Sequence, residues 1–280
     1  MMSKCRAYFG NLNVFGGPSP TNIKSSAKLH KLEQANEDGI LIFISDVWLD
    51  QLKVQQKLKI LFRGYSQFPP IAFVFMGNFL STQHGSTYAH TLKNCLKDLA
   101  DTILEYPPIV ENSKFIFVPG PLDPASANIL PRTPLPKFVT KDFEEKIPTA
   151  IFASNPCRIQ YCTKEIVVLR QDMVTKLCRN TIHFPSSGEI PEHFAKTIVC
   201  QATLSPLPLT VSPIYWAFDH ALTLYPLPDV IVVGDNFNAF TIEYMECQVV
   251  NPGSFPKSDF SFKAYCPATN AVEDSQIPNE

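Results

Sequence analysis

The stretch GILIFISDVWLD, residues 39–50, decides the expected fold. The apolar residues 40–44 are followed by a polar tip at Ser45 and Asp46, after which an amphipathic segment begins. An apolar run of this length bounded by a turn is typical of a strand buried on both faces. Because ligand sites in open α/β sheets lie beyond the carboxyl ends of strands, the tip at Asp46 is a candidate site. A D-x-H sequence there would supply two metal ligands, but the third residue is Trp48.

Further apolar runs predict the rest of a sheet-based domain. Residues 71–78 (IAFVFMGN) and 114–118 (KFIFV) read as buried strands. The second half has more strands and fewer helices, with strands expected at 149–156, 164–172, 229–234, 246–250 and 261–265. Apolar residues at helical spacing predict helices near 49–64, 92–103, 173–177 and 191–201, and residues 25–37 read as a short charged helix. This order predicts an α/β (α+β) fold, a two-sheet β-sandwich flanked by helices.

The same patterns divide the chain into three parts. Residues 1–38 are polar and rich in turns and predict an N-terminal connector, 39–266 a domain, and 267–280 a frayed C-terminal tail. Residues 122–148 predict a long proline-rich loop, of the kind that carries a function or a partner contact. The strand at 149–156 is expected to pair with the strand that follows it, around a turn.

Composition argues against several classes of protein. The 280 residues include 24 Lys+Arg and 26 Asp+Glu, a formal net charge of −2, so charge makes no general case for nucleic acid. No apolar run approaches the roughly 20 residues of a membrane span. The eight cysteines form no C-x-x-C pair, which predicts reduced thiols in a cytosolic or nuclear protein and no zinc site.

The common catalytic and binding motifs are missing as well. The sequence contains no G-x-x-x-x-G-K-[ST], no G-x-G-x-x-G and no G-x-S-x-G. The six histidines form no H-E-x-x-H or H-x-H pair. Lys and Arg occur singly, so direct reading of nucleic acid has weak support. The remaining candidate for a functional site is the series of residues at the ends of the predicted strands.

In chain order these tips read D-V-W (46–48), G-N-F (77–79), G-P-L-D (120–123) and G-D-N-F (234–237), followed by N-P-G-S (251–254). The succession resembles the calcineurin-like metallophosphoesterases, whose tips read D-x-H, G-D-x-x-D, G-N-H-[DE] and G-H-x-H. In that family these residues hold two divalent metals and a hydroxide that attacks a phosphoryl group.

Carried over position by position, the resemblance implies a degenerate site. Trp48 stands for the first His, and Asn78 stands for the bridging Asp. The other replaced positions are Pro121 and Leu122 in the third tip, Asp235 and Phe237 in the last, and Thr203 near the intervening His. The retained residues are Asp46, Asp123 and the glycines Gly77, Gly120 and Gly234. We therefore expect no catalytic residue, no cofactor and no two-metal centre, only a remnant site with apolar side chains filling the former cleft. That remnant comprises Asp46, Trp48, Asn78, Asp123 and Asp235.

The particular pattern of loss resembles the B-subunits of eukaryotic replicative DNA polymerases, which join an inactive phosphoesterase domain to an OB-fold. The segments that carry it, between about residues 10 and 275, are FGGPSP (15–20), ISDVWLDQL (44–52), FVPGPLDP (117–124), NPCRIQYCTKEIVV (155–168), LCRNTIHFPSS (177–187), LSPLPLTVSPIYWAFDHAL (204–222) and NPGSFPKSDFSFK (251–263). The resemblance implies that 39–266 is the inactive phosphoesterase-like domain. It also implies that 1–38 is what is left of a missing OB-fold or N-terminal region.

By this resemblance the chain is a non-catalytic accessory subunit located in the nucleus. It would scaffold the zinc-bearing C-terminal region of the polymerase's catalytic subunit and meet other replication-fork proteins through the holoenzyme, with DNA contact indirect or weak and no membrane contact. The proline-rich stretches 119–137 and 205–228 are candidate partner surfaces, with Arg158 and Arg179 as candidate anchors.

Two alternatives stay open. One is a metal-dependent phosphodiesterase with residual activity, which Asp46→Ala would abolish. The other is a direct DNA-binding module, whose affinity would fall steeply with salt.

Overall fold

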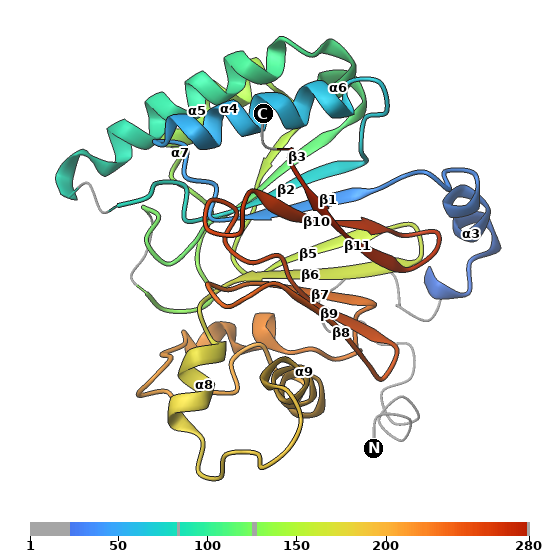
Figure 1. Cartoon of the computed structure of the whole chain (residues 1–280), viewed down its shortest axis with the longest axis vertical. Coiled ribbons are helices and arrows are strands. Elements are labelled where there is room, and N and C mark those ends of the chain that lie inside the picture. The colour runs from blue at the N-terminus through green and yellow to red at the C-terminus, as the bar shows by residue number, and fades with distance from the viewer. Residues whose placement is uncertain (1–22, 83–84, 125–127, 279–280) are drawn as a thin grey trace.

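Two β-sheets lie face to face in the computed structural model, with helices on both outer sides (Figure 1). The structure describes residues 23–82, 85–124 and 128–278. The first sheet has the strand order β11-β10-β1-β2-β3-β4. Its strands are β1 (Leu41–Ser45), β2 (Ala72–Met76), β3 (Lys114–Val118), β4 (Ala150–Phe152), β10 (Ser261–Cys266) and β11 (Ala271–Gln276). Strands β1 to β4 are parallel, and β10 and β11 add an antiparallel edge.

The second sheet has the order β5-β6-β7-β9-β8. Its strands are β5 (Cys157–Tyr161), β6 (Lys164–Arg170), β7 (Val230–Gly234), β8 (Phe240–Tyr244) and β9 (Cys247–Asn251). The three central strands β6, β7 and β9 are parallel, and both edge strands are antiparallel to their neighbours. The carboxyl ends of β6 and β7 therefore lie together, as those of β1, β2 and β3 do in the first sheet.

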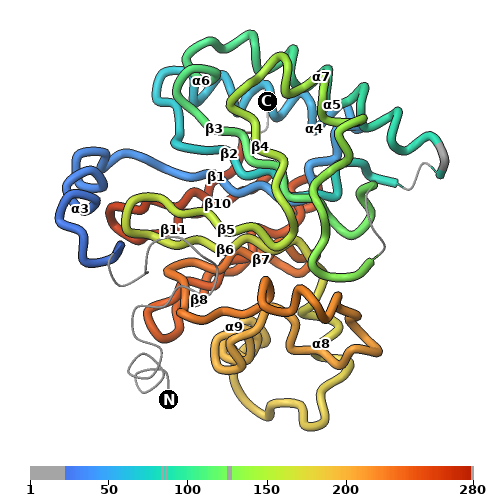
Figure 2. Tube along the Cα trace, turned by 180° about the vertical axis from the view of Figure 1, so that it is seen from behind, coloured from blue at the N-terminus to red at the C-terminus, as the bar shows by residue number. Residues whose placement is uncertain are grey.

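Helices close the two outer faces and one end of the sandwich (Figures 1 and 2). The first sheet is covered by α4 (Leu52–Tyr65), α5 (Tyr88–Leu104), α6 (Pro107–Asn112) and α7 (Lys137–Lys146), with the short 3₁₀ turn η1 (Gly85–Thr87) before α5. The second sheet carries α8 (Val174–Asn180), α9 (Ile190–Gln201) and the 3₁₀ helix η2 (Trp216–Leu222). Helix α3 (Ala27–Gln34) lies at the end of the sheets opposite the strand tips.

Successive side chains of the apolar strands serve two different layers, which explains why the runs are uninterrupted. On β1, Ile42 and Ile44 pack in the cluster beneath the helices. The alternate residues Leu41 and Phe43 pack between the sheets, where the second sheet contributes residues such as Val232. A strand buried on both faces needs an apolar residue at every position.

The predicted two-sheet architecture is confirmed, and so are helices at α3, α4, α5, α8 and α9. The predicted loop 122–148 is wrong in its second half, because α7 packs its residues Val139 and Phe143 into the core beneath the helices. The predicted hairpin is also wrong: β6 pairs with β5, whereas β4 belongs to the first sheet beside β3.

The prediction of a frayed tail from residue 267 is wrong as well. Strand β11 pairs with β10 along its whole length, from Ala271 to Gln276. At the other end, residues 1–22 of the predicted connector lie outside the described residues. The part that is described docks on the β5–β6 turn, where the Glu33 carboxylate accepts hydrogen bonds from the Thr163 backbone N–H (3.2 Å) and hydroxyl (2.5 Å). No helix of the described residues is both long and apolar enough to cross a membrane.

Candidate functional site: an arginine among the strand ends

Three predicted site residues come together at the carboxyl ends of β1, β2 and β3. Asp46, Asn78 and Asp123 are all buried. The Asp46 carboxylate accepts the backbone N–H of Asn78 at 3.2 Å. Asp123 accepts the backbone N–H groups of Phe79 (2.9 Å) and Gly120 (2.7 Å). The three strand tips that the sequence pattern groups together are therefore direct neighbours in space.

The tips approach one another this closely only because Gly77 has no side chain. A Cβ built on Gly77 would lie 1.9 Å from an Asp123 carboxylate oxygen and 2.5 Å from the backbone nitrogen of Gly120. Both distances are far inside van der Waals contact, and one of the opposing atoms is backbone, so any larger residue would push β2 and β3 apart. The close packing of the strand tips therefore explains why residue 77 is a glycine.

The centre of the site is Arg170, the last residue of β6 and fully buried. Its Nη2 donates to Asp46 Oδ1 at 2.7 Å, and its Nη1 donates to Asp172 Oδ1 at 2.9 Å. The same guanidinium donates to the backbone oxygens of Gly77 (2.5 Å) and Gly234 (3.0 Å). One side chain thus ties the ends of β1 and β2 in the first sheet to the end of β7 in the second.

The charges at Arg170 and Asp172 stabilise each other. Burial works against the charged guanidinium, but Asp46 and Asp172 outweigh it and hold the pKa of Arg170 above its usual value. Burial also works against ionised Asp172, yet Arg170 and the backbone amide of Asn236 lower its pKa. The site therefore contains a permanent cation that belongs to the protein.

A second buried arginine, Arg132, lies next to Arg170 and donates to its backbone carbonyl. Its Nη2 donates to Gln171 Oε1 at 2.9 Å and also to Asn128. Burial, together with the neighbouring charge of Arg170, lowers the pKa of Arg132 to about 10. Asn155 fixes the backbone of Arg170, accepting its N–H at 3.0 Å and donating to its carbonyl at 2.7 Å.

The other two carboxylates of the predicted remnant are occupied by backbone N–H groups. Asp235 accepts from Met173 (2.5 Å), Val174 (3.0 Å) and Phe237 (2.9 Å). Burial raises the pKa of Asp235 in spite of those amides. Burial likewise raises the pKa of Asp123 to about 6, against the pull of its amide donors and of the Tyr88 hydroxyl. These carboxylates act as caps for loop backbone.

The expected filling of the cleft by apolar side chains is wrong. Trp48 is only partly buried, packs on the cluster beneath the helices, and lies under the Lys257 ammonium at 5.5 Å from its ring centre. Phe237 packs on a different cluster, under α8 and α9, and Leu122 is 40% exposed. Thr203 pairs with Thr223 in a separate bridge. A guanidinium, not a set of apolar groups, stands between the strand ends.

Sequence reasoning missed Arg170, Arg132, Asn155 and Asp172. The one available signal was a cation at the end of the apolar run in KEIVVLRQD (164–172), a position where a buried strand would otherwise keep an apolar residue. Within the described residues no group of three or more His, Cys, Asp or Glu side chains is arranged to hold a metal ion. The arrangement is chemically an ion pair whose carboxylates already accept hydrogen bonds from the protein.

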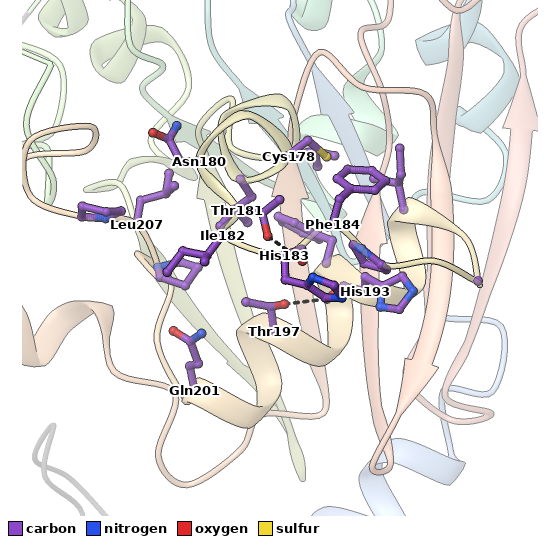
Figure 3. A pocket seen from close by; sticks show the side chains of 18 residues that line it. Cys178, Asn180, Thr181, Ile182, His183, Phe184, His193, Thr197, Gln201 and Leu207 are labelled. Carbon is purple, nitrogen blue, oxygen red and sulfur yellow. Dashed lines mark hydrogen bonds between the residues drawn. The ribbon is translucent and has the colours of Figure 1, made fainter.

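A pocket of about 520 Å³ lies elsewhere, between α8, α9 and the loop that joins them (Figure 3). Its lining includes His183, Phe184, His193 and Leu207. The Nε2 atom of His193 is hydrogen-bonded to the Ser187 carbonyl at 2.6 Å. None of the predicted site residues lines this pocket.

Fold and site together define a two-sheet α/β domain with an arginine ion pair at its strand ends, and the sequence assigns that domain to a family. The sequence model of the DNA polymerase alpha/epsilon B-subunit family matches residues 41–242, so the chain belongs to this family.

Its relatives include DNA polymerase epsilon subunit 2 of Homo sapiens, 53% identical over 98% of this chain and 52% of that protein. The protein of the same name in Drosophila melanogaster is 44% identical over 98% of this chain and 52% of its own length. The chain thus spans about half the length of the curated relatives it matches. Among solved structures, one described as a novel archaeal phosphodiesterase is 9% identical, with a TM-score of 0.47 over 84% of this chain and 98% of that one. Likeness at that level carries no argument about chemistry.

Arg170→Met should destabilise the domain by about 3–5 kcal/mol, because it leaves the Asp46 carboxylate buried without its partner. The measurement is urea unfolding followed by circular dichroism. Arg179→Met is the matched control, since Arg179 is exposed on α8 and should change stability by no more than about 0.5 kcal/mol. Adding Asp46→Asn to Arg170→Met should recover part of the loss. Equal stability of wild type and Arg170→Met would contradict the structural role of the pair.

The pKa of Asp123 makes a prediction about pH. Because the folded value, about 6, lies above the ordinary 3.8, the folded state binds a proton that the unfolded state does not. Stability relative to Asp123→Asn should therefore rise as pH falls, by about 1.4 kcal/mol between pH 7.5 and 5.0. Urea unfolding of both proteins at the two pH values measures the difference. A difference that stays constant would show that Asp123 titrates normally, and one that shrinks toward pH 5.0 would show a lowered pKa; either result would contradict the raised pKa.

Proposed function

We propose that the chain is a non-catalytic accessory (B) subunit of DNA polymerase epsilon that scaffolds the catalytic subunit in the replication holoenzyme. Membership of the B-subunit family over residues 41–242 is the observation that carries this proposal. The relatives named as subunit 2 of this polymerase support the choice of polymerase.

The strand-end geometry supports a scaffold without phosphoesterase activity. Two-metal hydrolysis needs a carboxylate bridging two dications and an open position for the attacking water. Here the bridging position is Asn78, whose side-chain oxygen accepts the Leu122 N–H at 2.9 Å. The neighbouring Asp46 is neutralised by Arg170 at 2.7 Å. A fixed guanidinium repels a dication at the same place. Both the residue types and the local charge therefore differ from those that a two-metal site needs.

The partner is the zinc-bearing C-terminal region of the catalytic subunit, and other replication-fork proteins are reached through the holoenzyme in the nucleus. A formal net charge of −2 supports DNA contact that is indirect or weak. For the domain organisation, we keep residues 1–38 as a connector and begin the phosphoesterase-like domain at residue 39. Its end moves from 266 to 276, because β11 completes the first sheet.

The test is co-purification of the intact chain with the tagged catalytic subunit, measured by affinity capture and size-exclusion chromatography. We expect a stable one-to-one complex that is lost when the catalytic subunit lacks its zinc-bearing C-terminal region. The loss should be selective, because the scaffold contacts that region rather than the polymerase core.

Thermal unfolding of the chain alone provides the control that it is folded before mixing. A folded chain that fails to bind the complete catalytic subunit would contradict the proposal. Binding that is unaffected by removing the C-terminal region would contradict the assignment of the partner region.

A further inference from the structure

A lysine is buried near the edge of the sandwich, where β11 is the outermost strand of the first sheet and β8 that of the second. Lys263 of β10 is 3% exposed. Side chains alternate along a strand, and Tyr265, two positions further on, packs between the sheets, so Lys263 lies on that inner face as well. Its ammonium donates to Thr241 Oγ1 of β8 at 3.0 Å. The side chain therefore reaches from the first sheet to the edge strand of the second.

The counter-ion of Lys263 lies mostly in solvent. Asp274 of β11 is directly opposite Lys263 in the sheet, and its carboxylate forms an ion pair with the ammonium. The Lys263 side chain is 3% exposed, whereas that of Asp274 is 81% exposed. An exposed carboxylate loses little free energy when it leaves such a pair for water, but a buried ammonium needs an anion. Asp274 is therefore a counter-ion that another anion can replace.

The Lys263 ammonium also has a hydrogen-bond donor to spare. A lysine carries three N–H donors and no acceptor. Among residues 23–82, 85–124 and 128–278, its partners are the Thr241 hydroxyl and the Asp274 carboxylate, which leaves one donor. A buried donor without an acceptor is unfavourable, so the third N–H favours a further oxygen atom at this place.

A cavity of about 340 Å³ lies beside Lys263 and Asp274. This volume is at the small end of the range for ligand pockets in proteins, about 300–1,000 Å³. The other lining residues come from β10 and β11 and from the loops next to β8 and β9; they are Ala239, Pro252, Ser261, Phe262, Ser275 and Gln276. The cavity thus combines a buried positive charge with hydroxyl, amide and apolar groups.

The charges around the cavity restrict a ligand to a single negative charge. Glu243 lies two positions after Thr241 on β8 and shares its face; it is exposed, and its carboxylate accepts the Gln248 side-chain N–H at 3.2 Å. Glu273, next to Asp274, is exposed on the opposite face of β11. With these carboxylates nearby, one ammonium offsets one negative charge, and a phosphate dianion would keep an uncompensated charge. A carboxylate carries one charge and has two oxygens to accept the ammonium's donors.

We propose that this cavity binds a carboxylate with a short apolar body, which takes the place of the Asp274 carboxylate beside Lys263. A free small organic acid and the glutamate side chain of a partner protein share this chemistry. The lining of the cavity includes neither Asp46 nor Arg170, so the site is distinct from the strand-end cluster. It is also additional to the proposed function.

The test measures the dissociation constant of butyrate for the intact chain by ligand-observed NMR titration. Asp274→Asn should bind butyrate about 10-fold more tightly, because the competing carboxylate is gone, and Lys263→Met about 10-fold more weakly or worse. Lys141→Met is the matched control and should bind as wild type does, because Lys141 and its partner Glu145 are both exposed on α7. Thermal unfolding shows whether each variant is folded. If Lys263→Met does not fold, the gain expected for Asp274→Asn still tests the proposal.

A blocked tripeptide with a central glutamate and inorganic phosphate are titrated alongside butyrate. Tighter binding of the tripeptide supports a partner's side chain as the ligand, and tighter binding of butyrate supports a free acid. The proposal is overturned if wild type binds neither carboxylate, if phosphate binds more tightly than both, or if Asp274→Asn leaves the affinity unchanged. None of these results depends on capture of the catalytic subunit, so the two proposals fail or stand separately.

Discussion

The ion pair between Arg170 and Asp46, 2.7 Å apart and almost completely excluded from solvent, is the interaction on which the strand-end region depends. A buried pair is not by itself a large source of stability, because both charges must first be desolvated. Its importance here lies in position. The guanidinium also donates to backbone oxygens at the ends of β2 and β7, so one side chain fixes the meeting point of the two sheets.

In the metallophosphoesterases that the sequence resembles, the strand tips hold two dications with carboxylates and imidazoles. Here an arginine supplies a permanent positive charge, and the remaining carboxylates accept backbone N–H groups. The result is a set of loops held by the protein's own charges and amides. The tight packing at Gly77 persists because backbone N–H groups and the Asp123 carboxylate still meet there.

Much of the fold was predictable because strands buried on both faces are built from apolar residues, as β2 is throughout and β1 is up to Ser45. The grouping of Asp46, Asn78 and Asp123 was predictable because parallel strands bring their carboxyl ends together. Helix α7 was hidden by the prolines before it. Strand β11 was hidden by its polar sequence, AVEDSQ, which suits an exposed edge strand with only one neighbour. Arg170 escaped prediction because an arginine after an apolar run reads as the end of a strand, and only its long-range contacts show that it turns inward.

On the proposal that the chain is a non-catalytic subunit, the Arg170 guanidinium leaves no metal site at the strand ends, and this can be tested directly. The measurement is a calorimetric titration of the intact chain with Mn²⁺, run beside the Asp46→Asn variant. We predict no saturable Mn²⁺ binding by the wild-type chain and no difference between the two proteins. One or two equivalents of Mn²⁺ bound by the wild type and lost in Asp46→Asn would contradict this prediction.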